Sequence, residues 1–392
     1  MERQDVKIRL DCRYFPGDRP CAFHKSEGAS CQTCRHYAKR GISILIIKFD
    51  ALGDVLRTTS ILPSLKRQHG QTFVTWITAP DAAPLLIGNP YVDEVVSDSA
   101  IYLAMIHTRH FDIAINPDAS PRSCDLASLV NAETKYGFVS SPKGTIVPIG
   151  DAALYWLELG ANDTLKRANR KTYQQIIHEI CELDPTGQHI VVRLTEAEVQ
   201  ERDRLREDLG LDPSVLTIGI NTGAGARWPL KKWRIGGFID LIGMVGDEIP
   251  CQILLLGGPS DHETNQIVKA RSHGKIRYRQ ASSLRQFLEL IDLCDVVVTG
   301  DTLAAHAAVG LGKRVVVLFG PTSPHEVDLY GVGEKIIAPI DCICCYKQRC
   351  DRSPNCMDLI TPEMVLAALK RQIEALKEDF KRDEILVGEP GR

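Results

Sequence analysis

The chain has 392 residues, of which 44% are apolar and 25% charged, and its formal net charge is −3. This length suits two domains and this composition suits a soluble globular protein, while the small negative charge argues against a nucleic-acid partner. The first residues are charged, and no run of about 18 apolar residues occurs, so we expect neither a signal peptide nor a membrane span. The protein is therefore expected in the cytoplasm.

An alternation of strands and helices begins after an N-terminal segment, residues 1–41. Residues 42–49 form a short apolar run rich in β-branched side chains, which predicts a strand buried on both faces. The pattern predicts further strands at 73–77, 92–96 and 111–116, and helices at 55–67 and 80–87. Strands that alternate with helices pair in parallel, so residues 42–188 are expected to form one Rossmann-like domain.

A second alternation follows helices predicted at 173–183 and 195–209 and indicates a second Rossmann-like domain over residues 189–377. Its apolar runs and helical patterns predict strands at 216–221, 252–256, 295–299 and 314–319, and helices at 233–245, 284–294 and 302–310. The sequence Thr361-Pro362-Glu363 has the N-cap, proline and early acid of a helix start, and that helix should reach residue 377. Residues 378–392 are expected to be a loose tail. The fold class is α/β, with the parallel sheets of two domains facing a central cleft.

Ligands of open parallel sheets bind beyond the carboxyl ends of the strands, so the residues there are the first candidates for a site. Gly53 and Asp54 follow the first strand, and the glycine permits close backbone approach to a ligand. Free N–H groups of the helix that starts there attract an anion. Asp54 is a catalytic candidate, although an acid that only stabilises the helix start is an alternative.

The second predicted domain offers polar residues after three of its strands. Thr222 and Gly223 follow the first strand and could hold a phosphate, and Glu263 follows the second and could accept bonds from a ribose, or be an exposed helix acid. Asp301 and Thr302 follow the third strand and open a helix that carries His306 one turn later. The helix start again offers free N–H groups to a phosphate.

Four blocks of sequence, taken in order, resemble glycosyltransferase family 9, the ADP-heptose heptosyltransferases of lipopolysaccharide core synthesis. The blocks are ILIIKFDALGDVLRTTSILPSLK, IGINTGAGARWPLKKW, ILLLGGPSDHE and VVVTGDTLAAHAAVGLGKRVVVLFGPTSP. The resemblance covers roughly residues 42–370 and implies the GT-B fold, inversion at the anomeric carbon and no catalytic metal.

The resemblance also implies roles for individual residues. The family's general base falls on Asp54, and its motif for the donor's phosphates and sugar falls on Asp301, Thr302 and His306. Its phosphate-proximal loop falls on Thr222 and Gly223, and its ribose-contacting acid falls on Glu263. Asp54 would accept the proton of the acceptor hydroxyl as that hydroxyl attacks the anomeric carbon.

Two departures from the family pattern concern the donor. A lysine often precedes the family's Trp-Pro and supplies a cation to the diphosphate, but Ala226 stands here, so Arg227 or Lys231 would have to take that role. Leu303 replaces a glycine that many members have after the Asp-Thr pair, so the donor could differ from ADP-heptose.

Eight of the thirteen cysteines are predicted to bind structural metal in two groups. Clustered cysteines in a reducing compartment favour zinc or iron over disulfides. The first group lies in a segment too poor in apolar residues to fold around its own core, and the second resembles the cysteine-bearing tail of some family members, including protein heptosyltransferases that hold iron there. The two groups are Cys12, Cys21, Cys31 and Cys34, and Cys342, Cys345, Cys350 and Cys356.

Three functions are compatible with these observations. The first is an inverting transfer of heptose from a nucleotide-sugar, ADP-heptose by resemblance, to a lipid-linked or surface glycan acceptor, with peripheral contact to the cytoplasmic face of the inner membrane. The second keeps this chemistry but uses a protein side chain as acceptor. The third is a metal-stabilised scaffold without turnover, against which the presence of Asp54 and Asp301 argues.

Overall fold

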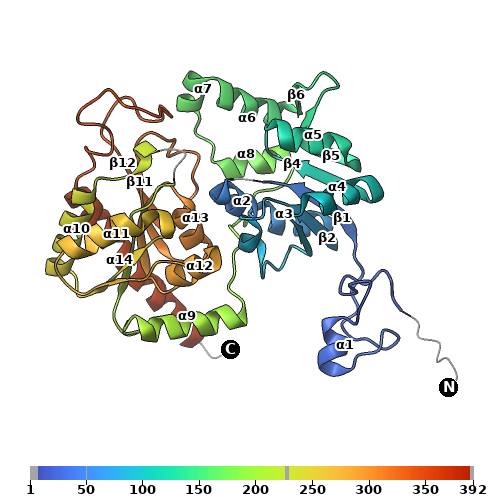
Figure 1. Cartoon of the computed structure of the whole chain (residues 1–392), viewed down its shortest axis with the longest axis horizontal. Helices are drawn as coiled ribbons and strands as arrows, with labels where there is room; N and C mark the ends of the chain where they lie inside the picture. The colour runs from blue at the N-terminus through green and yellow to red at the C-terminus, as the bar shows by residue number, and fades with distance from the viewer. Residues whose placement is uncertain (1–7, 50, 226–228, 389–392) are drawn as a thin grey trace.

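The computed structural model describes residues 8–49, 51–225 and 229–388. Two α/β halves lie side by side, each built around one six-stranded sheet (Figure 1). Every strand pair is parallel except one, because β6 runs antiparallel to β5. The predicted fold class is thereby confirmed.

The first sheet has the strand order β3-β2-β1-β4-β5-β6. The run at its centre is buried from Ile44 to Ile47, as expected for a strand covered on both faces. Two strands of this sheet, the fifth and sixth, were not predicted from the sequence. The strands are β1 (Ile42–Ile47), β2 (Thr72–Ile77), β3 (Glu94–Val96), β4 (His110–Asn116), β5 (Asn131–Ser140) and β6 (Ile146–Ile149).

Seven α-helices and one 3-10 helix accompany this sheet in the described residues. The prediction of a single helix at 55–67 is wrong, because the chain turns at Thr59 and Ser60 and then starts a new helix. Pro63 then falls in the first turn of that helix, where no N–H is required. The helices are α2 (Leu52–Thr58), α3 (Ile61–His69), η1 (Ala83–Leu86), α4 (Ser99–Thr108), α5 (Pro121–Leu129), α6 (Asp151–Ala161), α7 (Asp163–Ala168) and α8 (Tyr173–Ile180).

The second sheet has the strand order β12-β11-β10-β7-β8-β9. Its central strand is completely buried and consists largely of valine, which suits a pleated surface packed on both sides. The strands are β7 (Thr217–Asn221), β8 (Gln252–Leu256), β9 (Ile276–Tyr278), β10 (Val296–Gly300), β11 (Arg314–Phe319) and β12 (Gly333–Ile337).

The helices of the second half include a long C-terminal one. The expectation of a loose tail at 378–392 is wrong in part, because the last helix continues to Gly388. The helices are α9 (Glu196–Asp208), η2 (Pro229–Lys231), α10 (Ile235–Glu248), η3 (Pro259–Asp261), α11 (His262–Arg271), α12 (Leu284–Asp292), α13 (Leu303–Gly310) and α14 (Pro362–Gly388). No helix among the described residues combines the length and apolar character needed to cross a membrane.

Both sheets reverse their strand order at an equivalent point. The first strand of each half pairs on one side with the second and on the other side with the fourth, at β1–β4 and β7–β10. Open α/β sheets bind ligands beyond the carboxyl ends of the strands at such a reversal. The loops that follow β1, β7 and β10 are therefore the ones that build a site.

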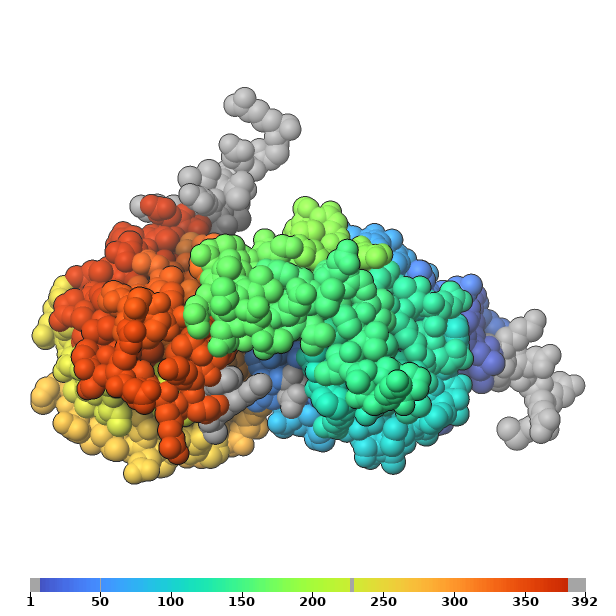
Figure 2. Space-filling model, turned by 90° about the horizontal axis from the view of Figure 1, so that it is seen from above, coloured from blue at the N-terminus to red at the C-terminus, as the bar shows by residue number. Residues whose placement is uncertain are grey.

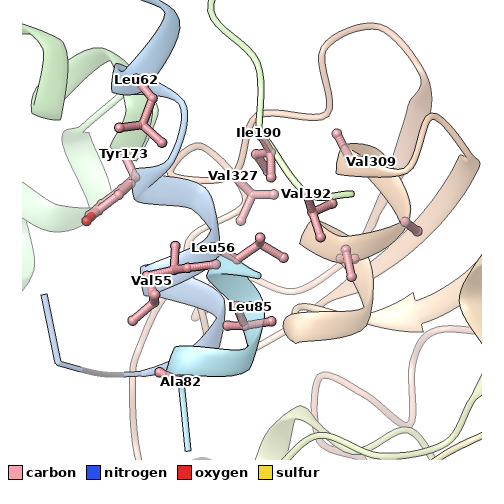
Figure 3. Packing of buried hydrophobic residues seen from close by; sticks show 14 of the residues in the cluster. Val55, Leu56, Leu62, Ala82, Leu85, Tyr173, Ile190, Val192, Val309 and Val327 are labelled. Atoms are coloured by element: carbon pink, nitrogen blue, oxygen red, sulfur yellow. The ribbon is translucent and has the colours of Figure 1, made fainter. Parts of the chain in front are cut away.

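A shared apolar core joins the two halves. Val55 and Leu56 of α2 belong to the same buried cluster as Val309 of α13, with Ile190 and Val192 of the connecting segment between them (Figure 3). Burying one such side chain contributes about 1.5–3 kcal/mol. This shared core holds α2 against α13.

The N-terminal segment extends from the first half and carries the short helix α1 (Ala22–Glu27) (Figure 1). None of its described residues, 8–41, is buried. It is attached by an ion pair from Arg13 to Asp93 and by Arg40, whose guanidinium lies 4.6 Å from the centre of the Phe73 ring.

Candidate active site between the two sheets

A cavity of about 930 Å³ lies where the loops of the two sheets meet. Its walls include Asp54 from the first half and Asp301 from the second. The predicted residues Gly53, Gly223, Lys231, Thr302 and His306 also line it. Pockets that hold drug-sized ligands measure about 300–1,000 Å³, so this interdomain cavity is large enough for a nucleotide-sugar.

The first wall presents Asp54 at the start of α2. The helix begins after Ala51, so Asp54 lies in its first turn and carries its negative charge at the positive end of the helix. One of its carboxylate oxygens lies 2.9 Å from a terminal nitrogen of Arg57, one turn further along. The acid is thus held in one orientation beside the cavity.

Asp54 is ionised at neutral pH. Its partial burial opposes the charge, but the cations Arg57 and Lys48 outweigh burial and lower the pKa of the carboxyl to about 2. Lys48 is itself 2% exposed and donates to the carboxylate of Asp118 at 2.5 Å. The first wall therefore contains a permanently charged acid backed by two buried cations.

His306 connects the two walls. Its ring packs so closely on α2 that a Cβ added at Gly53 would lie 3.1 Å from the His306 Cδ2. The imidazole is 4% exposed, and its Nδ1 is buried without a hydrogen-bond partner among the described residues. Burial, reinforced by the nearby Arg57, lowers the pKa of His306 to about 4, so the ring is neutral at physiological pH.

The second wall is organised around Asp301. The Lys231 ammonium donates to a carboxylate oxygen of Asp301 at 2.7 Å and to its main-chain oxygen at 3.0 Å. The Thr322 hydroxyl donates to the same carboxylate oxygen at 2.8 Å. Burial raises the pKa of Asp301, but Lys231 and His306 outweigh it, and the net shift is downward.

The start of α13 completes an anion site on this wall. Thr302 is the N-cap of the helix, and its hydroxyl accepts a hydrogen bond from the Ala304 N–H at 3.2 Å. The helix start and the Lys231 ammonium together place positive charge at one end of the cavity. Such an arrangement can hold a diphosphate.

The beginning of the loop after β7 is held by hydrogen bonds and lies close to η3. The Asn221 side chain donates to the Gly223 carbonyl and to the Thr299 hydroxyl, both at 3.0 Å. A Cβ added at Gly223 would lie 2.5 Å from a carboxylate oxygen of Asp261, so only glycine fits there without a shift. The absence of a side chain lets the Asp261 carboxylate approach the loop backbone.

Two predicted residues do not line the cavity, and a third lies outside the described residues. Thr222 is buried and donates to Asn265 at 2.7 Å, so its hydroxyl supports the loop. Glu263 is exposed on α11 and does not line the cavity, whereas Asp261, two residues earlier, does. Arg227 lies outside the described residues.

All thirteen cysteines are free thiols. In the described part of the chain, no three His, Cys, Asp or Glu side chains form a group able to hold a metal. Burial first, and then the nearby Cys345, Cys350 and Cys342, raise the pKa of Cys356 to about 11. The four N-terminal candidates are all partly exposed.

Two residues at the first wall were not predicted. Arg57 lies three residues after Asp54, a spacing that brings two side chains together on a helix and could have indicated the pair. Lys48 ends the apolar run of the first strand, where a lysine needs a buried partner. That partner, Asp118, is 70 residues away in sequence and could not be named without the fold.

The family model described as glycosyltransferase family 9 (heptosyltransferase) matches residues 104–355, more than half of the chain. Lipopolysaccharide heptosyltransferase 2 of Salmonella typhimurium is 30% identical over 129 residues, which cover 32% of this chain and 36% of that relative. The chain thus matches about a third of the length of this curated relative.

Two solved structures share the fold. The glycosyl transferase family 9 protein of Veillonella parvula has a TM-score of 0.70 and 18% identity, over 86% of this chain and 98% of that one. Escherichia coli ADP-heptose lipopolysaccharide heptosyltransferase II has a TM-score of 0.65 and 19% identity, over 86% and 99%. The predicted GT-B fold is confirmed.

Proposed function

Because this chain belongs to glycosyltransferase family 9, we propose that it transfers a heptose from ADP-heptose to a lipopolysaccharide-type glycan, with inversion at the anomeric carbon. The choice of donor rests on the likeness to the E. coli ADP-heptose lipopolysaccharide heptosyltransferase II, and that of acceptor also on the Salmonella relative. Such an acceptor would bring the protein to the cytoplasmic face of the inner membrane as a peripheral protein.

One observation carries this proposal: an ionised acid and an anion site lie on opposite walls of one cavity. Asp54 lines the first wall, and Lys231 and the start of α13 line the second. Glycosyl transfer from a nucleotide-sugar needs a base for the acceptor hydroxyl and positive charge for the departing diphosphate. A sugar bound between the walls would have its anomeric carbon within reach of both.

The reaction is a direct displacement. The oxygen of the acceptor hydroxyl attacks the anomeric carbon, and the bond from that carbon to the diphosphate oxygen breaks. Asp54 accepts the hydroxyl proton, and because its pKa is about 2, this transfer becomes favourable only as the attack makes the hydroxyl more acidic. Lys231 and the N–H groups at the start of α13 stabilise the charge on the leaving ADP.

The remaining donor contacts are assigned by their positions. Asp301 holds the Lys231 ammonium in place, and Thr302 caps the helix that faces the diphosphate. Gly223 lets the backbone after β7 approach the donor, supported by buried Thr222. Among the acids after β8, Asp261 lines the cavity, so contact of Glu263 with the ribose would require the α11 start to move inward.

A screen of donors and acceptors tests the proposal. The protein is incubated with ADP-heptose, or with other nucleotide-sugars, and with truncated lipopolysaccharides or candidate proteins, and products are identified by mass spectrometry. We expect ADP release together with a gain of one heptose on a glycan acceptor. If heptose is found on a protein side chain, the acceptor is a protein and not a glycan. If no donor releases a nucleoside diphosphate, the proposal of an enzyme is refuted and a scaffold role remains.

We also propose that the C-terminal cysteine group holds a structural zinc or iron ion. The influence of Cys342, Cys345 and Cys350 on the pKa of Cys356 supports this, although the four thiols would have to move closer around the ion. The N-terminal group, Cys12, Cys21, Cys31 and Cys34, is proposed as a second such site because none of the described residues 8–41 of its segment is buried. Metal analysis of Cys356→Ser and Cys12→Ser should show one ion fewer in each, and unchanged content would refute the corresponding site.

A further inference from the structure

A second cavity, of about 220 Å³, adjoins the interdomain cavity. Trp156, Gly160, Lys166, Glu326 and Tyr346 line both cavities, so the two lie next to each other. We call the smaller one the side cavity. Its volume is below the range of about 300–1,000 Å³ for drug-sized ligands, and so it suits a single sugar ring rather than a nucleotide.

The side cavity lies where α6 and α7 of the first half meet the chain after β11. Figure 2 shows this part of the first half, in green, against the orange-red C-terminal part of the second. Trp156 of α6 supplies an aromatic surface, and its ring packs edge-on against Tyr173 with centroids 5.5 Å apart. The Lys166 ammonium of α7 lies 4.4 Å from the centre of the Tyr346 ring.

Glu326 is the acid of the side cavity, and its backbone is fixed from the first half. The Glu326 carbonyl accepts hydrogen bonds from the Tyr173 N–H at 3.0 Å and from Arg57 at 3.3 Å. Its carboxylate accepts from the Tyr346 hydroxyl at 3.4 Å. Carboxylates accept several hydrogen bonds, so Glu326 can also bind the hydroxyls of a ligand.

Tyr346 comes from the cysteine-rich segment 342–356. Its N–H donates to the Pro321 carbonyl at 2.9 Å, and its hydroxyl accepts from the Ser323 N–H at 3.2 Å. These bonds hold Tyr346 at a φ of 50°, which is unfavourable for a residue with a side chain. The cysteine-rich segment thus forms part of the wall of the side cavity.

Arg57 joins the side cavity to the base. One terminal nitrogen of its guanidinium lies 2.9 Å from the Asp54 carboxylate, and the other donates to the Glu326 carbonyl. Arg57 therefore contacts both the proposed base and the backbone of a residue that lines the side cavity. In an inverting displacement, the acceptor hydroxyl attacks the anomeric carbon opposite the leaving diphosphate, and the base lies next to that hydroxyl.

We propose that the side cavity binds the acceptor's sugar ring next to the attacked hydroxyl, with Trp156 against its apolar face and Glu326 accepting from its hydroxyls. This inference rests on the proposed function, because it takes the interdomain cavity as the donor site. Aromatic rings pack well on the apolar faces of flat ligands, and the acid gives the hydrogen-bonding specificity.

Binding of a small glycoside to the full-length protein tests the proposal. The methyl glycoside of a heptose is titrated in the presence of saturating ADP and followed by ligand-observed NMR, while the affinity for ADP is measured separately by calorimetry. We expect Trp156→Ala to weaken glycoside binding at least about tenfold, as the loss of one aromatic contact implies, with the ADP Kd changed less than twofold. Trp156→Phe should restore most of the affinity, and Glu326→Gln should weaken it several-fold.

Leu154→Ala on the same helix is the matched control, because Leu154 is 43% exposed and lines neither cavity. It should bind the glycoside like the parent. No binding by the parent, or equal binding by Trp156→Ala and the parent, would overturn the assignment of the side cavity. If the parent does not bind ADP but binds the glycoside in a way that depends on Trp156, the donor proposal is contradicted and the sugar site is supported.

Discussion

The two ends of the interdomain cavity are built in different ways. At the anion end, Asp301 and Thr302 directly follow β10, and Lys231 belongs to the short helix after β7, so each of these residues lies at most ten positions after a strand end. At the other end, Trp156 and Lys166 come from helices. Glu326 comes from the loop between β11 and β12, and Tyr346 comes from the irregular segment after β12.

This difference follows from what each end would recognise. A diphosphate is held by backbone N–H groups and one cation, which a strand, a tight loop and a helix start supply locally. A sugar needs an aromatic surface and hydroxyl partners at defined distances, which this chain assembles from segments distant in sequence. Substitutions at the anion end should therefore affect the donor, and those at the side cavity should affect the acceptor.

The largest effect is expected at Asp54, the proposed base. Asp54→Asn keeps the shape of the side chain and removes the proton acceptor, so heptose transfer should fall about 10²- to 10⁴-fold, the usual contribution of general base catalysis. The ADP Kd should change little, because the base belongs to neither end. The rate constant of product formation is measured under single-turnover conditions, and the ADP Kd is measured by calorimetry.

Arg57→Lys is the companion variant for Asp54, since it keeps a cation beside the carboxylate but loses the planar fork that reaches both Asp54 and Glu326. Its transfer rate should lie between the parent and Asp54→Asn. A transfer rate of Asp54→Asn within threefold of the parent would rule out Asp54 as the base.

The next effect concerns the anion end alone. Lys231→Met removes a charge-assisted contact worth about 1.5–3 kcal/mol, so the ADP Kd should rise about ten- to a hundredfold, while binding of the heptose glycoside should not change. Lys232→Met is the matched control, because Lys232 is exposed and does not line the cavity. If Arg227→Ala weakens ADP binding and Lys231→Met does not, Arg227 is the cation that serves the diphosphate.

The same difference explains what the sequence could predict. Asp54, Asp301, Thr302 and His306 were identified because each lies within seven residues of a strand end, and strand ends are visible as the limits of apolar runs. Glu263 and Asp261 are two residues apart, and the sequence could not tell which faces the cavity. That choice depends on the 3-10 turn η3, where Asp261 packs against the backbone of Gly223.

The side cavity could not be predicted in this way. Trp156 looks like an ordinary apolar residue of a helix, and its exposure to a cavity depends on the chain after β11, more than 160 residues later. Tyr346 lies in a segment whose cysteines suggested only metal binding. Their proximity is a property of the packing between the two halves, which a periodicity along the chain does not contain.

A smaller effect is expected from the pH dependence of the contact between the halves. The pKa of buried His306 is about 4, against an ordinary value of 6.5 in the unfolded chain. Its contribution to stability is therefore fully present above pH 6.5 and is lost as the pH falls toward 4. At about 1.4 kcal/mol per pKa unit, the parent should lose about 2 kcal/mol from this group between pH 7.5 and pH 5.

Urea unfolding of the parent and of His306→Gln at these two pH values measures the contribution. The absolute stability of His306→Gln is not the test, because the substitution also alters packing. The test is the change with pH, which should be about 2 kcal/mol smaller in the variant. Equal changes in the two proteins would mean that His306 is not buried in its neutral form.

The smallest effect is expected at Gly53, where α2 touches His306. Alanine is favoured over glycine inside a helix by about 0.5–1 kcal/mol, and Gly53 has no left-handed backbone that would oppose it. The added Cβ, however, would lie 3.1 Å from the His306 ring, so the ring or the helix must move by a few tenths of an ångström. Gly53→Ala should therefore change stability by less than about 1 kcal/mol and lower kcat a few-fold, since Asp54 is the next residue.

Gly243→Ala is the control, because Gly243 lies in α10 with open space around its Cβ. This variant should gain stability without any change in kcat. Identical behaviour of the two variants would show that the contact of α2 with His306 does not position the base.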